Sequence, residues 1–153
     1  MAEKNPNDPI GAVERIYKAW DEALGAKDLD AAVALYAPDA TIESPLVAHL
    51  LGVQSGVCQG HDELRRFIRL VFQRQPAARK RFRTGYFTDG TKLMWEYPRD
   101  TPDGEQMDFV EVMELKEGLI QHHRVYWGWF GLSILKKGQH YPLRTARGSI
   151  RRA

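Results

Sequence analysis

Four stretches in the second half of the chain are separated by short segments with strong turn chemistry, and this alternation restricts the possible folds more than any other feature. The separators are Asp89-Gly90, the pentapeptide DTPDG at 100–104 and the tripeptide KEG at 116–118. Glycine after aspartate, and glycine at the third position of a three-residue loop, are typical of hairpin turns. The sequence therefore predicts a meander of antiparallel strands over residues 81–88, 91–99, 105–115 and 119–135.

The first half of the chain shows helical periodicity instead. Apolar residues recur there at three- and four-residue steps, which is the spacing of one helix face. An aspartate is a good helix N-cap, and a proline stops a helix that has already begun. The predicted elements are, in order, a helix over 9–26, a helix from Asp28 to Pro38, a strand over 40–45, a packed loop or short helix over 46–60 that is a candidate lid, and a helix from His61 or Asp62.

Three helices followed by a meander indicate an α+β fold in which the helices cover one face of a curved, mostly antiparallel sheet. The 153 residues suffice for one domain, which we place at 9–135. Residues 1–8 are expected to be flexible. Residues 136–153 carry six basic residues and no acidic one, and we expect a solvated, flexible tail there rather than a nucleic-acid site.

The composition argues against several classes of protein. No stretch is apolar enough to cross a membrane, and the polar N-terminus lacks the apolar core of a signal peptide. Cys58 is the single cysteine, so an internal disulfide is excluded. Together these features predict a cytoplasmic protein.

The turn at 116–118 suggests which residues meet across the last hairpin. If Leu115 pairs with Leu119 around a three-residue loop, Glu111 lies directly opposite His123 on an otherwise apolar face. A two-residue loop would instead pair Glu111 with Arg124 on the outer face. The sequence leaves both registers open.

A glutamate and a histidine that meet in an apolar interior form a candidate catalytic pair. The apolar setting raises the proton affinity of a carboxylate, while a neighbouring imidazolium lowers it again. Such a pair can transfer a proton near neutral pH. A buried hydrogen bond that only satisfies both groups is the alternative for Glu111 and His123.

The same strand parity predicts an apolar pocket between the helices and the sheet. Histidine 123 and every second residue after it should face this pocket, together with aromatic residues of the helices. The predicted lining residues are Trp20, Tyr36, Phe67, Phe109, Val125, Trp127 and Trp129, with Ser44 and His49 near the mouth.

We expect neither a cofactor nor a metal ion in this pocket. The sequence contains no glycine-rich phosphate loop and no nucleophile motif. Cys58 and His61 have half of the spacing of a zinc site, without a second half.

Three segments resemble the SnoaL-like, nuclear transport factor 2-like superfamily: residues 20–45, GHDELRRFI at 60–68, and GLIQHHRVYWGW at 118–129. The resemblance covers about residues 9–135. It implies a conical α+β half-barrel, a deep apolar pocket, and commonly a homodimer through the outer sheet face. Members include ketosteroid isomerases, polyketide cyclases, limonene-type epoxide hydrolases and dehydratases, and proteins that only bind or scaffold.

The resemblance also suggests roles by position. The proton-shuttling aspartate of ketosteroid isomerases falls on Ser44, their oxyanion tyrosine on Trp20, and their protonated oxyanion-hole aspartate on Glu111. One aspartate of the epoxide hydrolases falls on Val125. Another falls near Glu96, which the resemblance turns inward although strand alternation places it on the polar face.

These features together predict a small-molecule pocket protein. The first expectation is a cofactor-independent acid/base enzyme of the isomerase, cyclase or dehydratase type, with Glu111 and His123 as its catalytic pair and a hydrophobic cyclic substrate. The alternative is a non-catalytic ligand-binding or dimerisation module with the same pocket. The expected partners are a hydrophobic small molecule and a second copy of the chain, with neither nucleic acid nor a membrane.

Overall fold

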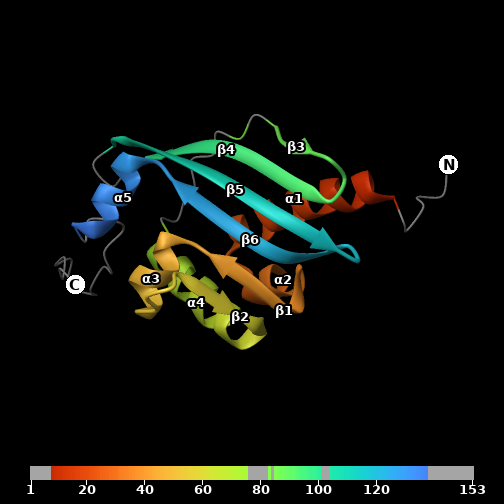
Figure 1. Ribbon diagram of the computed structural model, residues 1–153, viewed down its shortest axis with the longest axis horizontal. Coiled ribbons are helices and arrows are strands. Elements are labelled where there is room, and N and C mark those ends of the chain that lie inside the picture. The colour runs from red at the N-terminus through yellow and green to blue at the C-terminus, as the bar shows by residue number, and fades with distance from the viewer. Residues whose placement is uncertain (1–7, 76–82, 84, 101–103, 138–153) are drawn as a thin grey trace.

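The computed structural model describes residues 8–75, 83, 85–100 and 104–137. It is built from five helices and six strands within these residues (Figure 1). In chain order they are α1 Pro9–Ala26, α2 Leu29–Ala34, β1 Tyr36–Glu43, α3 Pro45–Leu51, β2 Val57–Gln59, α4 Gly60–Arg74, β3 Phe87–Thr88, β4 Lys92–Asp100, β5 Gln106–Lys116, β6 Leu119–Trp127 and α5 Trp129–Lys136.

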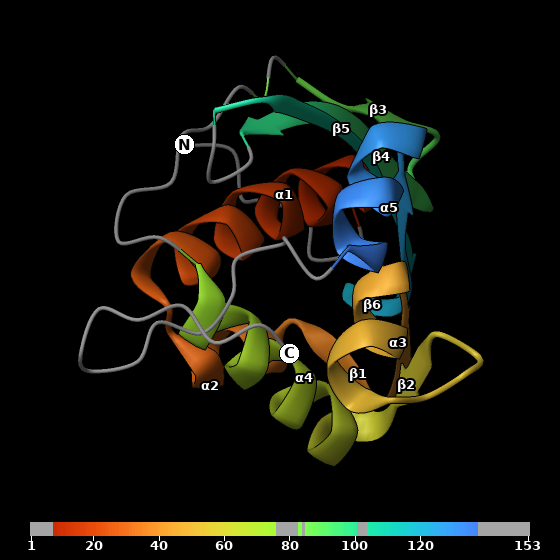
Figure 2. The ribbon, with the colours of Figure 1, turned by 90° about the vertical axis from the view of Figure 1, so that its left-hand side faces the viewer.

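All six strands belong to one curved sheet with the order β2-β1-β6-β5-β4-β3. β1 runs parallel to β6, and the other neighbours are antiparallel. Helices α1, α2 and α4 lie on one side of the sheet, which bends around them, while α3 and α5 lie together at one end (Figure 2). The predicted α+β fold, with helices on the inner face of a curved sheet, is confirmed.

Local sequence signals account for where three helices begin. Asp8 Oδ1 accepts a hydrogen bond from the N–H of Ile10 at 3.1 Å, and Asp28 Oδ1 accepts one from Ala31 at 2.9 Å. Ser44 caps α3 in the same way. Each cap satisfies a backbone N–H that has no partner within its helix. The first helix therefore occupies the predicted range.

The second helix is shorter than predicted, and the first strand is longer. α2 ends at Ala34, and Tyr36 already pairs with Ile120 of β6. Pro38 does not end a helix. It lies inside β1, between Tyr36 and Thr41, where the pairing with β6 shifts its register. Proline is tolerated at such an irregularity because its missing N–H leaves no ladder position unfilled.

The β5–β6 turn is the two-residue loop of the second predicted alternative, but the pairing beyond it differs from both predicted registers. Lys116 pairs with Leu119 around a two-residue turn in which Glu117 and Gly118 both have positive φ, of 53° and 76°. This is the turn geometry that fits the twist of a hairpin. Beyond it, Gln121 is an extra residue in β6, and this bulge shifts the register by one.

Because of the bulge, Glu111 and His123 lie on the same face of the sheet, as the three-residue loop predicted. They are not direct cross-strand partners, as that loop would have made them. Glu111 lies opposite Val125, and His123 lies opposite Met113. Glu111 and His123 are therefore diagonal neighbours on the same face of the sheet. A diagonal pair is still within reach when both side chains are long.

The predicted strand over 119–135 is wrong in its second half. β6 ends at Trp127, and α5 follows after Gly128. Gly131, Ile134 and Leu135 are buried, a spacing of three and four residues that fits a helix and not a strand. The missing side chain of Gly131 lets this helix approach Trp127.

The segment at 46–60 contains a short helix, as predicted, followed by β2 on the edge of the sheet. Its role as a lid stays a prediction. The flexible ends predicted at 1–8 and 136–153 lie outside the described residues except for Asp8, Lys136 and Lys137. Residues 81, 82 and 84 of the strand predicted over 81–88 also lie outside them, and of the rest only Phe87 and Thr88 form a strand, β3. Within the described part of the chain, no helix combines the length and the apolar character that a membrane span needs.

Candidate functional site

A cavity of about 80 Å³ lies between the helices and the inner face of the sheet. Most of its wall is aromatic or aliphatic, and a few polar side chains converge on it. The lining residues are Trp20, Leu24, Tyr36, Ile42, Ser44, Leu46, Phe67, Ile68, Val71, Phe72, Gln75, Tyr97, Arg99, Phe109, Glu111, His123, Val125 and Trp127.

Glu111 and His123 form a hydrogen-bonded pair in the wall of this cavity. The Oε2 atom of Glu111 lies 2.7 Å from Nε2 of His123. The two residues are 2% and 3% exposed, respectively. Alternation along β5 and β6 turns both side chains inward, because each strand directs every second residue toward the helices.

The pair is part of a longer chain of hydrogen bonds. The hydroxyl group of Tyr97 donates to Glu111 Oε1 at 2.6 Å. At the other end, the hydroxyl of Tyr36 lies 2.8 Å from Nδ1 of His123 and accepts a hydrogen bond from the indole N–H of Trp20 at 3.3 Å. Five side chains from α1, β1, β4, β5 and β6 are connected in this way.

These contacts assign the protons along the chain. A carboxylate at Glu111 can only accept, so it accepts from Tyr97 and from a proton on Nε2 of His123. Nδ1 of the neutral imidazole is then an acceptor, and the Tyr36 hydroxyl, which accepts from Trp20, donates to it. The assignment follows from the hydrogen-bond partners and leaves Glu111 as a carboxylate that accepts two hydrogen bonds.

Burial shapes the chemistry of Tyr36 most clearly. Removal from water raises the pKa of its phenol, and the nearby Glu111 carboxylate raises it further. The phenol therefore keeps its proton throughout the physiological range. Tyr36 can act as a hydrogen-bond donor to His123 but not as a phenolate base.

Cross-strand pairing also builds the aromatic side of the cavity. Tyr97 pairs with Phe109, which pairs in turn with Trp127. The Tyr97 and Phe109 rings stack at 5.4 Å between centroids, and the Phe109 and Trp127 rings meet edge to face at 4.6 Å. A ring placed between this row and α4 would be surrounded by apolar and aromatic surface.

The structure brings most of the predicted lining residues together. Trp20, Tyr36, Ser44, Phe67, Phe109, Val125 and Trp127 all line the cavity beside the Glu111–His123 pair. Ser44 Oγ accepts a hydrogen bond from the N–H of Leu46 and thereby caps α3.

Three predicted lining residues lie elsewhere. His49 is exposed on α3. Glu96 lies on the outer face of β4, as plain alternation indicated, so the inward position that the resemblance suggested is wrong. Trp129 is 79% exposed because the chain has already left the sheet and begun α5.

Sequence reasoning did not single out Tyr97, Arg99 or Gln75 as lining residues. Tyr97 shares the inner face of β4 with the buried residues Leu93 and Trp95, so its alternation with them was an available signal. Gln75 follows the last turn of α4, and no local pattern marks it as a cavity residue. The described residues contain no group of three or more histidine, cysteine, aspartate or glutamate side chains placed to hold a metal ion.

The fold matches solved structures of low sequence identity. An NTF2-like protein of unknown function from Burkholderia pseudomallei K96243 superposes with a TM-score of 0.66 at 22% identity, covering 81% of this chain and 96% of that one. SalBIII, an epoxide hydrolase/cyclase-like enzyme of pyran ring formation in salinomycin, gives a TM-score of 0.60 at 22% identity and coverages of 77% and 92%.

A putative ketosteroid isomerase from Kribbella flavida DSM 17836 gives a TM-score of 0.59 at 19% identity and coverages of 77% and 78%. Similarity at these identities shows a shared fold and does not transfer an activity. No curated protein gives a significant sequence match. The model of the SnoaL-like domain matches residues 13–123, and because this range is more than half of the chain and contains both Glu111 and His123, the chain belongs to the SnoaL-like domain family.

Proposed function

We propose that this protein is a cofactor-independent acid/base enzyme that transfers a proton next to the carbonyl group of a small hydrophobic cyclic compound. The observation that carries the proposal is the buried Glu111–His123 pair, which is held by two tyrosines in the wall of an apolar cavity. A few polar groups that converge in an apolar cavity are the usual setting of such chemistry.

Glu111 is the base in this proposal. Its two oxygens each accept one hydrogen bond, from Tyr97 and from His123, and a carboxylate oxygen has a second lone pair available. Glu111 can therefore take a proton from the substrate carbon while both donors hold it in place. The substrate becomes an enolate.

The fate of that proton defines the reaction class. Its return to a different carbon is an isomerisation. Its loss together with hydroxide from the neighbouring carbon, which leaves as water, is a dehydration. His123 and Tyr97 are positioning residues in both cases, because they contact Glu111 and orient its carboxylate.

The cavity limits the size of the reacting group. Its volume of about 80 Å³ is well below the roughly 300–1,000 Å³ of pockets that enclose a drug-sized ligand. We therefore expect a single ring, or the reacting end of a longer molecule, to enter. Aromatic walls on the sheet side and the apolar face of α4 favour a ring over a flexible chain.

Proton exchange tests this proposal without knowledge of the natural substrate. Cyclohexanone and cyclohex-3-en-1-one are incubated with the protein in D₂O, and deuterium uptake and conversion to the conjugated enone are followed by NMR. We expect exchange with the wild type and a decrease in the exchange rate of about 10²–10⁴-fold in Glu111→Gln, the typical contribution of a general base.

Glu114→Gln is the matched control, since Glu114 is on the same strand and pairs with Arg124 on the outer face. Exchange that survives Glu111→Gln would contradict the proposal.

A non-catalytic ligand-binding module is the second candidate, and one observation favours it. The polar groups from Trp20 to Tyr97 already satisfy one another without a ligand. A self-contained network of this kind also serves to rigidify a core. A mere binder would bind cyclohexanone with similar affinity before and after Glu111→Gln and would catalyse no exchange in either form.

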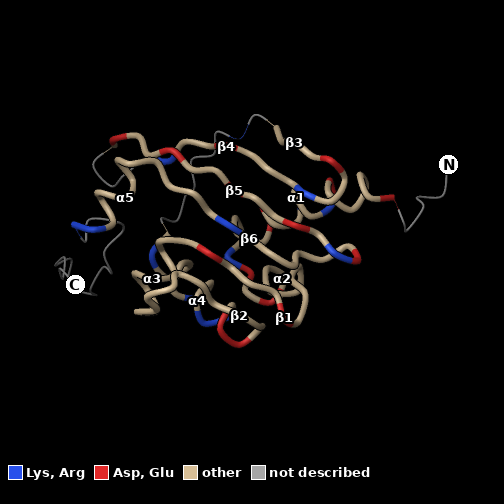
Figure 3. The backbone as a smooth tube through the Cα atoms, in the orientation of Figure 1, with Lys and Arg blue, Asp and Glu red and all other residues tan. Residues whose placement is uncertain are grey.

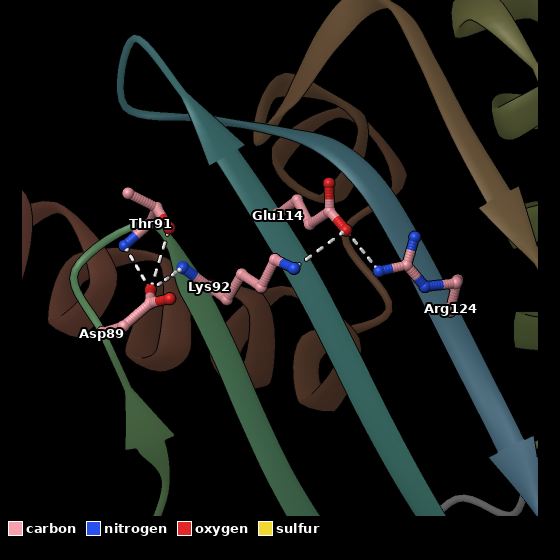
Figure 4. Close-up of polar contacts among 5 residues, drawn as sticks. All are labelled: Asp89, Thr91, Lys92, Glu114 and Arg124. Carbon is pink, nitrogen blue, oxygen red and sulfur yellow. Dashed lines mark hydrogen bonds and ion pairs between the residues drawn. The ribbon is translucent and has the colours of Figure 1, made fainter.

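We also propose that two copies associate through the outer face of β4, β5 and β6. Met94 and Tyr126 are exposed there, and Val112, which pairs with Met94, is half-buried. Around them, Glu114 pairs with Arg124 and Lys92 across three strands, as Figure 4 shows. Figure 3 marks charged residues of both signs along β4, β5 and β6. Apolar residues among charges of both signs are compatible with a self-complementary interface.

A further inference from the structure

One polar side chain in the cavity wall has a buried oxygen without a hydrogen-bond partner among the residues that the structure describes. Gln75, which directly follows α4, is 8% exposed and lines the cavity, and its Oε1 is the unpartnered atom. Its neighbours in the wall, Val71 and Phe72, are apolar. An unpaired buried amide oxygen costs folding free energy, so an apolar residue of the same size would suit a position that only packs.

The backbone of Gln75 is held from two sides. Its N–H donates to the carbonyl oxygen of Val71 at 3.0 Å, and its own carbonyl oxygen accepts a hydrogen bond from Nζ of Lys27 at 2.9 Å. Both main-chain groups are thus occupied. The side-chain amide is the part of the residue that remains to contact a molecule in the cavity.

We propose that Gln75 is a specificity-determining residue whose Oε1 accepts a hydrogen bond from a hydroxyl group of the ligand. The inference rests on the proposed function, because it takes the same cavity as the ligand site. Gln75 follows α4 on the helical side of the cavity, and the Glu111–His123 pair belongs to strands β5 and β6 of the sheet. The ligand is therefore a small ring with a hydroxyl group near the end of α4 and its reacting carbon at Glu111.

Matched ligands test the inference through binding alone. Cyclohexanone, 3- and 4-hydroxycyclohexanone and their two methyl ethers are titrated while tryptophan fluorescence is recorded, since Trp20 and Trp127 line the cavity. We expect the wild type to bind one hydroxyl compound about three- to tenfold more tightly than its ether, which cannot donate. Gln75→Leu should remove this preference and change the Kd of cyclohexanone by less than about twofold.

Two controls separate a ligand contact from a structural role. Gln73→Leu changes an exposed glutamine of the same helix and should keep the hydroxyl preference. Gln75→Leu and Gln75→Met should each leave Tm unchanged or raise it, because both remove the unpaired oxygen. A lower Tm in both variants would assign Gln75 a structural role and overturn the inference, and whichever variant keeps the wild-type Tm is used for the titrations.

The outcomes also distinguish this inference from the proposed function. A hydroxyl preference that depends on Gln75, without deuterium exchange in the wild type, supports the ligand class and rejects the catalysis. Deuterium exchange with cyclohexanone in the wild type, without any hydroxyl preference, supports the catalysis and rejects the ligand class. A preference that persists in Gln75→Leu, or a failure of the wild type to bind any of the five compounds, overturns the inference.

Discussion

Glu111 and His123 are joined by a hydrogen bond of 2.7 Å although neither is the other's partner in the β5–β6 ladder. Their side chains meet diagonally on the inner face, and the bulge at Gln121, which lies between this pair and the turn, sets the register that places them there. Both groups are almost fully buried. The contact is thus a product of the bulge and of side-chain length, and the hydrogen bonds from Tyr97 and Tyr36 complete it.

Removal of the Glu111 side chain should destabilise the protein strongly. Glu111→Ala leaves His123 and Tyr97 buried without their common acceptor, and each buried donor left unsatisfied typically costs about 1–3 kcal/mol. Glu111→Gln keeps an acceptor for Tyr97 and should cost less. Denaturant unfolding monitored by tryptophan fluorescence measures both. A loss below about 1 kcal/mol for the alanine variant would show that the pair is not an energetic part of the core.

Loss of the hydrogen bond from Tyr36 should be visible at Nδ1 of His123. In the wild type, nitrogen-15 NMR should show the imidazole proton on Nε2, since Nδ1 accepts from the Tyr36 hydroxyl. Tyr36→Phe removes that donor, so we expect the Nδ1 signal to shift while the proton stays on Nε2 against Glu111, with a loss of about 1–3 kcal/mol in unfolding free energy. Tyr126→Phe, at an exposed tyrosine, should change neither. An unaltered His123 spectrum in Tyr36→Phe would contradict the proton assignment.

The buried thiol of Cys58 should make the fold sensitive to alkali. Burial raises its pKa from about 9 to about 11. Because the folded-state pKa is the higher one, the neutral thiol's contribution is complete below pH 9 and is lost as the pH rises through 11. The difference in unfolding free energy between the wild type and Cys58→Ala should therefore shrink across this window.

The Cys58 thiol, 1% exposed, should react with a disulfide reagent at pH 8 only at the rate of unfolding, and rapid labelling of the folded protein would refute its burial.

The proposed association of two copies should be visible as molecular mass. Light scattering after size exclusion should give about twice the chain mass for the wild type, and Tyr126→Glu should raise the dissociation constant by about 10- to 100-fold. Arg66→Glu, on the exposed side of α4, is a charge change away from this face and should leave the mass unaltered. A monomeric wild type at micromolar concentration would reject the interface.

Local patterns predicted the secondary structure where the signal lies within a few residues. The apolar stripe of α1 and the aspartate cap of α2 depend on neighbours in sequence, and both are where they were expected, as are β4 and β5. Predictions failed at Tyr36 and Trp129, where a residue that suits helix and strand alike takes the structure that its tertiary contacts favour. Tyr36 joins a strand because Ile120 pairs with it, and Trp129 begins a helix because Gly128 ends the ladder.

The candidate site, too, was predictable from the sequence only in part. Sequence parity placed Glu111, His123, Phe109 and Trp127 on one apolar face, since side chains alternate along any strand. It could not place Tyr97 against Glu111 or leave Gln75 unpaired in the wall, because these relations depend on how β4 and α4 pack against the rest of the sheet.

The sequence by itself determined the helices α1 and α4, the antiparallel strands β4 and β5, and that one acid and one imidazole share the inner face. Only the tertiary structure decided how they meet: a two-residue turn and a bulge at Gln121 replaced the simple three-residue loop. The physical reason is that parity follows from local backbone geometry, whereas register, hydrogen-bond partners and the shape of a cavity follow from packing between distant parts of the chain.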